Sequence, residues 1–347
     1  MLRMLSPAAA RVPTSTVAIS LATFLLIASS CATATAPPPP AVASAATSGD
    51  AFPGAGLPAP LPPRAPGDGA FESLEGPLWV PSREVLLFSD VVERNGSGAR
   101  IYRFDPVTRQ FAPLSWPEVG PTSTNGLATD PRGRLVACER YNARLVRVEP
   151  DGKLTVLAER WPANDGPALN APNDVTIRAD GNIYFTDSDW GARPGVAHAP
   201  MGVYRVSPGG ELSRVLDLQK PNGIALSPDG ASLYVGSDAQ AKVWRLPLDA
   251  AGAVGAPTLL IDGAGVTGGF KVPDGICVDD TGNLYVTNND DAVKAIVVFD
   301  PAGHSLGRIA LPFRPSNCTF GGADRRTLYV TTLHGVYELR VPTAGAP

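Results

Sequence analysis

Six residues with side-chain oxygen atoms recur along the sequence at a nearly constant interval. They are Glu75, Asn125, Asn173, Asn222, Asp274 and Asn317, with spacings of 50, 48, 49, 52 and 43 residues. Carboxylate and carboxamide oxygens are the donors that hard divalent cations prefer, and calcium accepts roughly six to eight of them. If the fold brings these side chains together, the pattern predicts a calcium site. Magnesium is the second choice because it demands stricter octahedral geometry.

Each of the six recurring residues opens a similar unit of sequence. A short apolar run follows it, then a turn rich in Asp, Gly and Pro, and then a run of β-branched and aromatic residues. The copies are EGPLWVPSREVLLFSD (75–90), NGLATDPRGRLVACE (125–139), NDVTIRADGNIYFTD (173–187), NGIALSPDGASLYVGS (222–237), DGICVDDTGNLYVTN (274–288) and NCTFGGADRRTLYVTT (317–332). A period of about 40–50 residues with several short strands per unit is typical of a β-propeller. The sequence therefore predicts an all-β, six-bladed β-propeller over residues 71–342, with 343–347 as a tail.

The propeller geometry explains why the recurring residues are expected to converge. The first strand of every blade lines the central channel, and these strands run parallel to one another, so equivalent positions reach the same end of the channel. For any one copy, the alternative is that Asn-Gly or Asp-Gly only shapes a turn. Glu75 argues against that alternative because Glu is a poor turn former, and without a cation Glu75 and Asp274 would be two confined carboxylates.

The motifs resemble the senescence marker protein/gluconolactonase/luciferin-regenerating enzyme family of six-bladed propellers. The resemblance covers about residues 71–342 and rests on EGPLW around Glu75, LNAPNDV around Asn173, PNGIALSPDG around Asn222, PDGICVD around Asp274 and NCTFGG around Asn317. It implies a divalent metal, usually calcium, at the channel mouth and the hydrolysis of lactones.

The resemblance also assigns roles to individual residues. It implies that Glu75, Asn222 and Asp274 are metal ligands, and that Asn173 is either a fourth ligand or a contact to substrate or water. The motif YFTDSDWG around Asp187 is similar to bacterial gluconolactonases. We therefore expect substrate contacts from four residues: Asn125, Asn173, Asp187 and Asn317.

A mechanism follows as a hypothesis. The lactone carbonyl oxygen would coordinate calcium, or Mg²⁺, Mn²⁺ or Zn²⁺ in its place, and the cation would stabilise the developing oxyanion while water attacks. Asp274 is the candidate catalytic base because one of its oxygens can bind the metal while the other accepts a proton. The alternatives are a non-catalytic envelope propeller with structural calcium and, more weakly supported, a carbon–carbon bond-forming enzyme of the strictosidine-synthase type. The ring of oxygen donors favours the lactonase.

Composition excludes other functions. Lys and Arg number 29 against 33 Asp and Glu, with no basic block, which argues against nucleic-acid binding. The three histidines are too far apart for a helical zinc pair, and no Cys-x-x-Cys motif is present. Cys138, Cys277 and Cys318 are expected to be core residues, and the sequence leaves open whether two of them form a disulfide. The expected partner is a small-molecule lactone bound by a monomer.

The N-terminus predicts export. Arg3 and Arg11 precede an apolar run, VAISLATFLLIASS (17–30), that is shorter than the about 20 residues of a membrane span and fits a signal peptide over residues 1–30. Small residues before Cys31 resemble a bacterial lipobox, which would make Cys31 the lipidated mature N-terminus; the alternative is ordinary secretion. Residues 31–70 are rich in Pro and Ala and are predicted to form a disordered linker. The protein is thus expected in the periplasm or cell envelope.

Overall fold

The structure is a computed structural model that describes residues 50–63, 70–91, 100–114, 122–162, 165–192 and 194–347. The predicted signal peptide, Cys31 and the first part of the predicted linker lie outside these residues. Within the described part of the chain, no helix has the length and apolar character needed to span a membrane.

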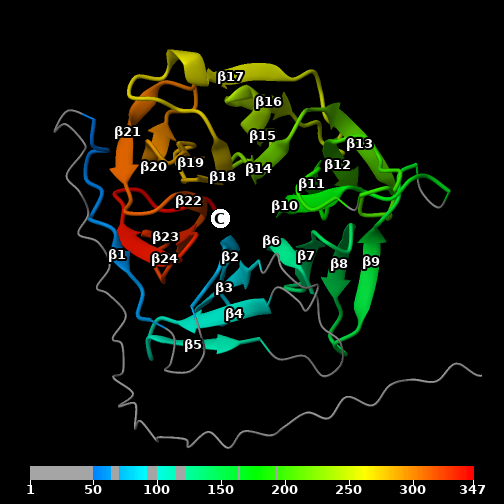
Figure 1. The fold of residues 1–347 in the computed structure, drawn as a ribbon, viewed down its shortest axis with the longest axis horizontal. Coiled ribbons are helices and arrows are strands. Elements are labelled where there is room, and N and C mark those ends of the chain that lie inside the picture. Colours follow the sequence, from blue (N-terminus) through cyan, green and yellow to red (C-terminus); the bar gives the residue numbers. More distant parts are fainter. Residues whose placement is uncertain (1–49, 64–69, 92–99, 115–121, 163–164, 193) are drawn as a thin grey trace, which may run out of the picture. The chain divides into compact units, whose positions relative to one another are not determined.

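Six four-stranded antiparallel sheets form a ring, with β2, β6, β10, β14, β18 and β22 around its centre (Figure 1). The predicted six-bladed propeller is therefore confirmed. Blade 1 consists of β2 (Leu74–Val80), β3 (Val85–Asp90), β4 (Arg100–Asp105) and β5 (Gln110–Pro113). Blade 2 consists of β6 (Thr124–Thr129), β7 (Leu135–Glu139), β8 (Arg144–Val148) and β9 (Leu154–Ala158). Blade 3 consists of β10 (Ala171–Ile177), β11 (Ile183–Ser188), β12 (Gly202–Val206) and β13 (Leu212–Asp217).

The remaining blades repeat the pattern. Blade 4 consists of β14 (Pro221–Leu226), β15 (Ser232–Ser237), β16 (Lys242–Pro247) and β17 (Thr258–Asp262). Blade 5 consists of β18 (Pro273–Val278), β19 (Leu284–Asn289), β20 (Lys294–Phe299) and β21 (Ser305–Ala310). Blade 6 consists of β22 (Pro315–Gly321), β23 (Thr327–Thr332), β24 (Gly335–Arg340) and, at its outer edge, β1 (Ala59–Pro60). Two short 3₁₀ turns, Asp238–Gln240 and Gly263–Gly265, lie in loops.

Strand β1 closes the ring, and here the structure differs from the prediction of a linker through residue 70. Strand β1 pairs with β24 as the outer edge of blade 6. Phe52 is buried and packs edge-on against Tyr285, with ring centroids 5.6 Å apart, and Leu61 is buried between blades 1 and 6. An edge strand tolerates proline because one side of its backbone needs no partner. Residues 50–63 are therefore part of the propeller, although their composition resembles a linker.

The second strands of the blades are buried on both faces. Every residue of β3, β7, β11 and β15 is buried, because each strand lies between the sheets of its two neighbours. Such strands read as continuous apolar runs instead of an alternating pattern. The core therefore lies between blades, in six apolar clusters around the ring.

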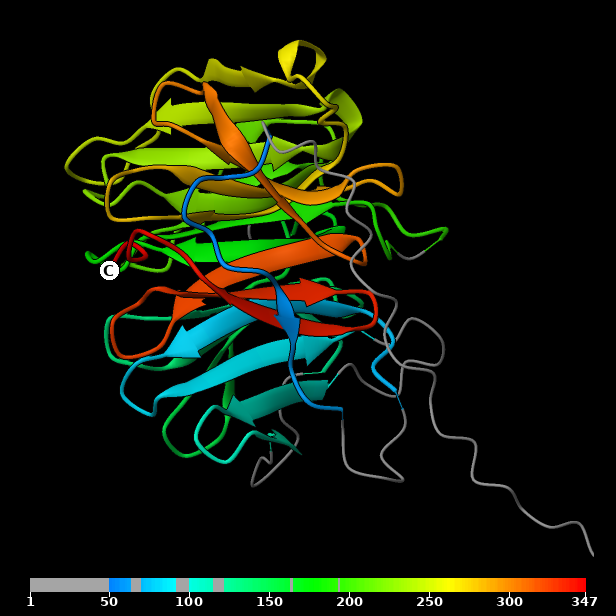
Figure 2. The same ribbon diagram turned by 90° about the vertical axis from the view of Figure 1, so that its left-hand side faces the viewer.

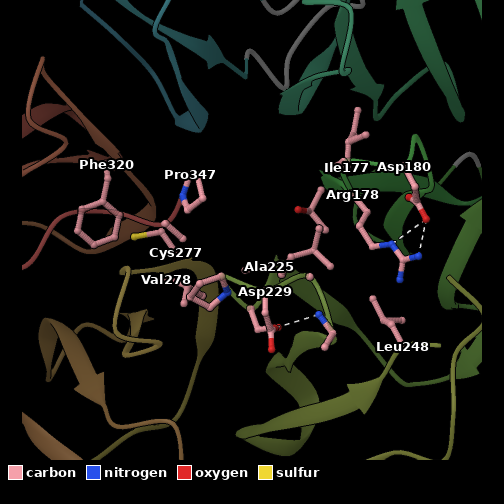
Figure 3. A pocket seen from close by; sticks show the side chains of 18 of the residues that line it. Ile177, Arg178, Asp180, Ala225, Asp229, Leu248, Cys277, Val278, Phe320 and Pro347 are labelled. Carbon is pink, nitrogen blue, oxygen red and sulfur yellow. Dashed lines mark hydrogen bonds and ion pairs between the residues drawn. The ribbon is translucent and has the colours of Figure 1, made fainter. Parts of the chain in front are cut away.

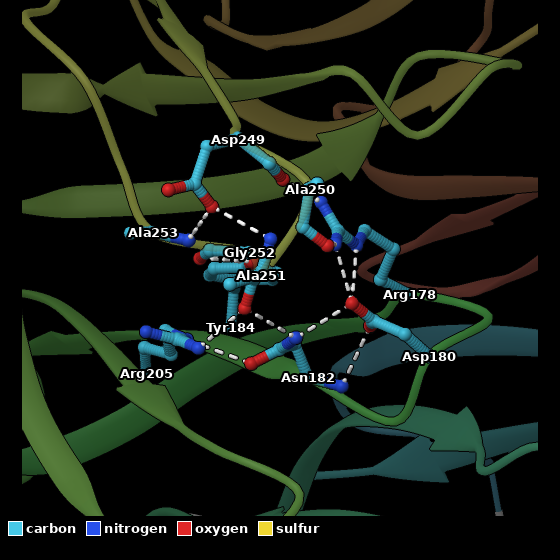
Figure 4. Close-up of polar contacts among 10 residues, drawn as sticks. All are labelled: Arg178, Asp180, Asn182, Tyr184, Arg205, Asp249, Ala250, Ala251, Gly252 and Ala253. Atoms are coloured by element: carbon cyan, nitrogen blue, oxygen red, sulfur yellow. Dashed lines mark hydrogen bonds and ion pairs between the residues drawn. The ribbon is translucent and has the colours of Figure 1, made fainter.

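A polar latch joins blade 3 to blade 4 (Figure 4). The turn 249–253 offers its carbonyl oxygens to side chains of blade 3: Arg178 donates to Asp249 O at 2.8 Å, and Tyr184 donates to Gly252 O at 2.6 Å. Asn182 donates to the same turn. A Cβ at Gly252 would lie 2.4 Å from Asn182 Nδ2, so the approach requires glycine. The latch fixes the relative position of the blades that carry Asn173 and Asn222.

Candidate active site

Each first strand is irregular at the position of its recurring residue. The pairing register with the second strand shifts directly after Glu75 in blade 1, and across the recurring residue in blades 2 to 5, for example between Pro221 and Ile224. In blade 6 it shifts between Pro315 and Asn317. A bulge leaves residues outside the ladder and re-aims their side chains. The recurring residues therefore sit at the bulges, where a strand can turn a side chain towards the channel.

The glycines that follow the recurring residues serve close packing. A Cβ on Gly126 would lie 2.6 Å from Asp174 Cα, and a Cβ on Gly275 would lie 2.5 Å from Asn317 Cα. Real Cβ atoms do not approach neighbours this closely, so only glycine lets the next blade come this near. The Asn-Gly and Asp-Gly dipeptides lie inside strands, and the alternative that they shape turns is wrong.

Hydroxyl groups on the second strands hold the backbone of the neighbouring blade's channel strand. Ser89 donates to Asn125 O at 2.8 Å, and Thr186 donates to Asn222 O at 2.8 Å. In blade 5, Thr287 donates in the same way to Ser316 O at 2.8 Å. Ser316 thus occupies in blade 6 the place that the recurring residues hold in blades 2 and 4.

Asn317 is displaced by one position from the predicted ring. Its backbone N–H donates to Thr331 Oγ1 at 3.1 Å, just as the N–H of Asp174 donates to Thr186 Oγ1 at 3.0 Å. Asn317 therefore matches Asp174, the residue after Asn173, and the predicted equivalence with the other five recurring residues is corrected. Asn317 Nδ2 lies 3.4 Å from Asp174 Oδ2, and the two residues come from opposite blades.

Asp174 is a channel residue that the sequence analysis missed. Its carboxylate also accepts bonds from the backbone N–H groups of Val175, at 2.9 Å, and Ile224, at 3.3 Å. Burial raises the pKa of Asp174 to about 6, and these bonds oppose the rise. The signal that could have revealed it is its polar type, since four of the other copies have glycine at this position.

Glu75, Asn222 and Asp274 act on one another electrostatically at the channel: the charge of Asp274 raises the pKa of Glu75, and the Asn222 carboxamide lowers that of Asp274. Burial raises the pKa of Asp274 to about 7; the Asn289 and Asn222 carboxamides oppose this rise, while the charges of Asp238 and Asp174 add to it. Asn289 Nδ2 donates to Asp274 Oδ2 at 2.6 Å. The pKa of Glu75 is raised well above its usual value by burial and then by repulsion from Asp274 and Asp174, whereas Arg140 lowers it.

The donor set fits a hard divalent cation. Glu75, Asn222 and Asp274 supply oxygen donors. The raised pKa values of Glu75 and Asp274 mean that their ionised forms are destabilised at this site, and a bound cation would stabilise those forms. Two buried carboxamide oxygens, Asn125 Oδ1 and Asn289 Oδ1, have no hydrogen-bond partner among the described residues. The described residues contain no group of three His, Cys, Asp or Glu side chains that could hold a metal by themselves. A cation here would therefore depend on carboxamides as well as carboxylates.

Asn173 and Asp187 lie in the same blade but in different settings. Asn173 is buried at the bulge of β10, beside Asp174. Asp187 is 0% exposed, and its carboxylate accepts bonds of 2.9 Å from the backbone N–H groups of Asn170 and Ala171 and from the Asn170 side chain. Asp187 holds the chain where it enters β10, and its expected contact to substrate stays a prediction.

A loop of blade 3 forms part of the rim on the same side as the recurring residues. Arg140 Nε donates to Trp190 O at 2.6 Å, and the ammonium group of Lys220 lies 5.4 Å from the centre of the Trp190 ring. Arg140 also acts electrostatically on Glu75. The sequence analysis did not identify Arg140, because neither its type nor its spacing distinguishes it from other surface arginines.

A cavity of about 870 Å³ lies at the other end of the channel (Figure 3). Its walls include the turns 178–180 and 227–231, which follow the first strands of blades 3 and 4, together with Cys277, Phe320 and Pro347. None of the six recurring residues lines it. The C-terminus lies on this face of the ring, and the loop after β11 projects from the opposite face (Figure 2).

Comparison with known proteins gives consistent matches. Residues 74–334 match the family model described as SMP-30/Gluconolactonase/LRE-like region. The chain is 30% identical over 293 residues to a gluconolactonase of Zymomonas mobilis, covering 78% of this chain and 79% of the relative. It is 28% identical over 270 residues to a 6-deoxy-6-sulfogluconolactonase of Pseudomonas putida, covering 74% and 82%. A solved gluconolactonase structure from Xanthomonas campestris superimposes with a TM-score of 0.66 at 30% identity, covering 83% of this chain and 98% of that chain.

Proposed function

Because the chain belongs to the SMP-30/gluconolactonase/LRE-like family, as its motifs predicted, we propose that it is a lactone hydrolase that depends on a divalent cation, most favourably calcium. Similar proteins named for the hydrolysis of sugar lactones support the reaction class. The observation that carries the proposal is the meeting of Glu75, Asn222 and Asp274 at the channel mouth, with both carboxyl groups raised in pKa.

The proposed ligands are Glu75, Asn173, Asn222 and Asp274. When bound, the cation supplies a Lewis acid that polarises the lactone carbonyl. Oxygen donors in this mixture suit calcium, and Mg²⁺, Mn²⁺ and Zn²⁺ are the cations to compare with it.

Asp274 is the proposed catalytic base. The bond from Asn289 fixes one of its oxygens, Oδ2, so the carboxylate has a defined orientation at the bulge of β18. Bound to the cation through one oxygen, Asp274 would take the proton of the attacking water on its other oxygen. Asn125, whose Oδ1 has no partner among the described residues, is a proposed contact to the substrate.

Asn317 and Asp174 are proposed to form the floor of the substrate site. Their side chains meet across the channel from opposite blades, at the positions directly after Asn173 and Ser316, so a substrate resting on the ligands would contact this pair. Arg140 and the Trp190 loop are proposed to form the rim, on the side from which substrate enters.

The direct test is hydrolysis of a lactone panel by the full chain. Aldonolactones, acyl-homoserine lactones and aromatic lactones are assayed by proton release, with chelator and then with each cation restored. We expect activity on at least one class that chelator abolishes and calcium restores. Inactivity of well-folded protein across the panel, with and without calcium, would favour the alternative of a non-catalytic propeller with structural calcium.

Export, lipidation and a monomeric state complete the proposal. The apolar run over residues 17–30, read as part of a signal peptide over residues 1–30, and the cysteine at position 31 support attachment to the cell envelope. The test is fractionation of cells that express the full chain or the variant Cys31→Ala. We expect the variant to leave the membrane fraction, and light scattering should give the mass of a single chain.

A further inference from the structure

Neighbouring first strands meet at fixed positions around the ring. In each of these contacts, one partner is the residue three places after the recurring residue of a blade, and the other partner lies on the first strand of the next blade. The pairs that share an apolar cluster in this way are Leu78 with Leu127, Ala128 with Val175, and Ala225 with Ile276. Each second member lies two places after the recurring residue of its own blade; in blade 6, where Ser316 holds that place, the corresponding residue is Cys318. These are packing positions, which aliphatic residues normally fill.

Between blades 5 and 6 both packing positions are cysteines. Cys277 pairs across its sheet with Tyr285, and Cys318 pairs with Val330, so their side chains point into the interface between these two blades. Both belong to the cluster around Tyr285. Cys318 Sγ lies 3.5 Å from Tyr285 O, the carbonyl of the residue that pairs with Cys277. After burial, the neighbouring Cys318 thiol is the next cause that raises the pKa of the Cys277 thiol.

The two thiols differ in access. Both are free in this structure, and Cys318 is 4% exposed. Cys277 is partly exposed and lines the cavity at the C-terminal face together with Pro347, and Figure 3 shows its sulfur directed towards Phe320. A small reagent that enters the cavity would therefore reach Cys277 first. Cys138 lies in a different cluster, between blades 2 and 3.

We propose that Cys277 and Cys318 form a dithiol pair that a small-molecule disulfide converts into a bond between blades 5 and 6. The Cys277 thiolate attacks one sulfur of the disulfide and releases one small thiol. The Cys318 thiolate then attacks Cys277 Sγ in the mixed disulfide and releases the second small thiol, which takes up the remaining proton. The protein loses two electrons and two protons, and the external disulfide is reduced to two thiols.

The position of the pair gives the bond a consequence. Cys277 is three residues after Asp274, and Cys318 directly follows Asn317, so the bond would tie together the two strands that carry these channel residues. An exported protein meets an oxidising compartment, where such bonds persist. Burial raises the pKa of the Cys277 thiol, which makes formation faster as the pH rises, because only the thiolate attacks.

The test is mass spectrometry of the full chain treated with oxidised glutathione, in a Cys31→Ala background that removes the N-terminal thiol. We expect the folded protein to lose two hydrogen atoms and to yield, after non-reducing digestion, a linked peptide that joins Cys277 and Cys318. In the variant Cys318→Ser, a glutathione adduct should accumulate on Cys277. The variant Cys277→Ser should give neither product.

Cys138→Ser is the matched control and should behave as the parent chain does. The parent chain alone decides the case if a variant fails to fold. A stable glutathione adduct on Cys277, a link that involves Cys138, or no change in mass while the parent protein stays folded would each overturn the proposal.

Discussion

The Asp174 carboxylate and the Asn317 carboxamide meet across the central channel, with Oδ2 and Nδ2 3.4 Å apart. The two residues come from β10 and β22, on opposite sides of the ring (Figure 1). They occupy the position that glycine holds in blades 1, 2, 4 and 5. The charge of Asp174 raises the pKa of both Glu75 and Asp274.

Replacing Asp174 by Asn should move the pH dependence of activity and calcium binding. The variant Asp174→Asn keeps an acceptor for the N–H of Ile224 but removes the charge that raises the pKa values of Glu75 and Asp274. Because the pKa values of the two ligands fall, we expect the acid limb of the pH profiles of activity and calcium binding to shift to lower pH by up to about one unit. Calcium titrations and rate profiles between pH 5 and 8 measure the shift.

Arg140→Gln is the companion variant, and it should shift the pH profile in the opposite direction. Arg140 lowers the pKa of Glu75, so its removal should move the same limb to higher pH. Shifts in the same direction for both variants would show that the charges do not act on the ligands as described.

Calcium should stabilise the fold more as the pH rises. Without a cation, Asp274 has a folded-state pKa of about 7, above its ordinary value of 3.8, so the folded protein binds this proton more tightly than the unfolded chain. That contribution to stability is complete below about pH 4 and is lost as the pH rises to 7. Calcium replaces the proton, so the gap in Tm between calcium and chelator should widen from pH 5 to pH 8.

Differential scanning calorimetry of the wild type and of Asp274→Asn checks this prediction. The variant loses one of the two titrating carboxyl ligands and keeps Glu75, so its gap should be smaller and should vary less with pH than that of the wild type. A wild-type gap that narrows with rising pH would contradict the assignment of Asp274 to the cation site.

Asp274→Asn should also remove catalysis without loss of the fold. Asn cannot accept a proton, and a positioned base contributes on the order of 10²-fold or more to the rate. The metal-free variant should be at least as stable as the wild type, because a buried carboxyl group is replaced by a neutral group of similar shape. Asp324→Asn, at an exposed ion pair with Arg340, is the control and should retain full kcat.

Glycine 275 should be irreplaceable for a steric reason. A Cβ there would lie 2.1 Å from Asn317 Oδ1, so Gly275→Ala should lower the free energy of unfolding by roughly 1–3 kcal/mol and weaken calcium binding by displacing Asp274. Gly335→Ala, at a strand position with no atom within 4 Å of the new Cβ, is the control. Urea denaturation compares the two, and equal effects would contradict the close approach of the blades.

The sequence was sufficient for the six blades because every copy repeats the same local pattern, and position in the repeat implies position in the channel. Asn317 was misplaced by one residue because blade 6 has Ser316 at the recurring position and an asparagine at the next position, so the residue type pointed to the wrong one of the two. Strand β1 was missed because its pairing with β24 joins residues far apart in the sequence, and its proline-rich composition resembles that of a linker.

The N-terminal segment should contribute measurably to stability, which tests its place in blade 6. Phe52 is buried against Tyr285, so Phe52→Ala should lower the free energy of unfolding by about 3–5 kcal/mol. Leu57 lies in the same segment but is 89% exposed, so Leu57→Ala should change stability by less than about 0.5 kcal/mol. Urea unfolding of the full chain gives both values. If the two variants are equally neutral, residues 50–63 form no part of the folded propeller, and the ring is closed without β1.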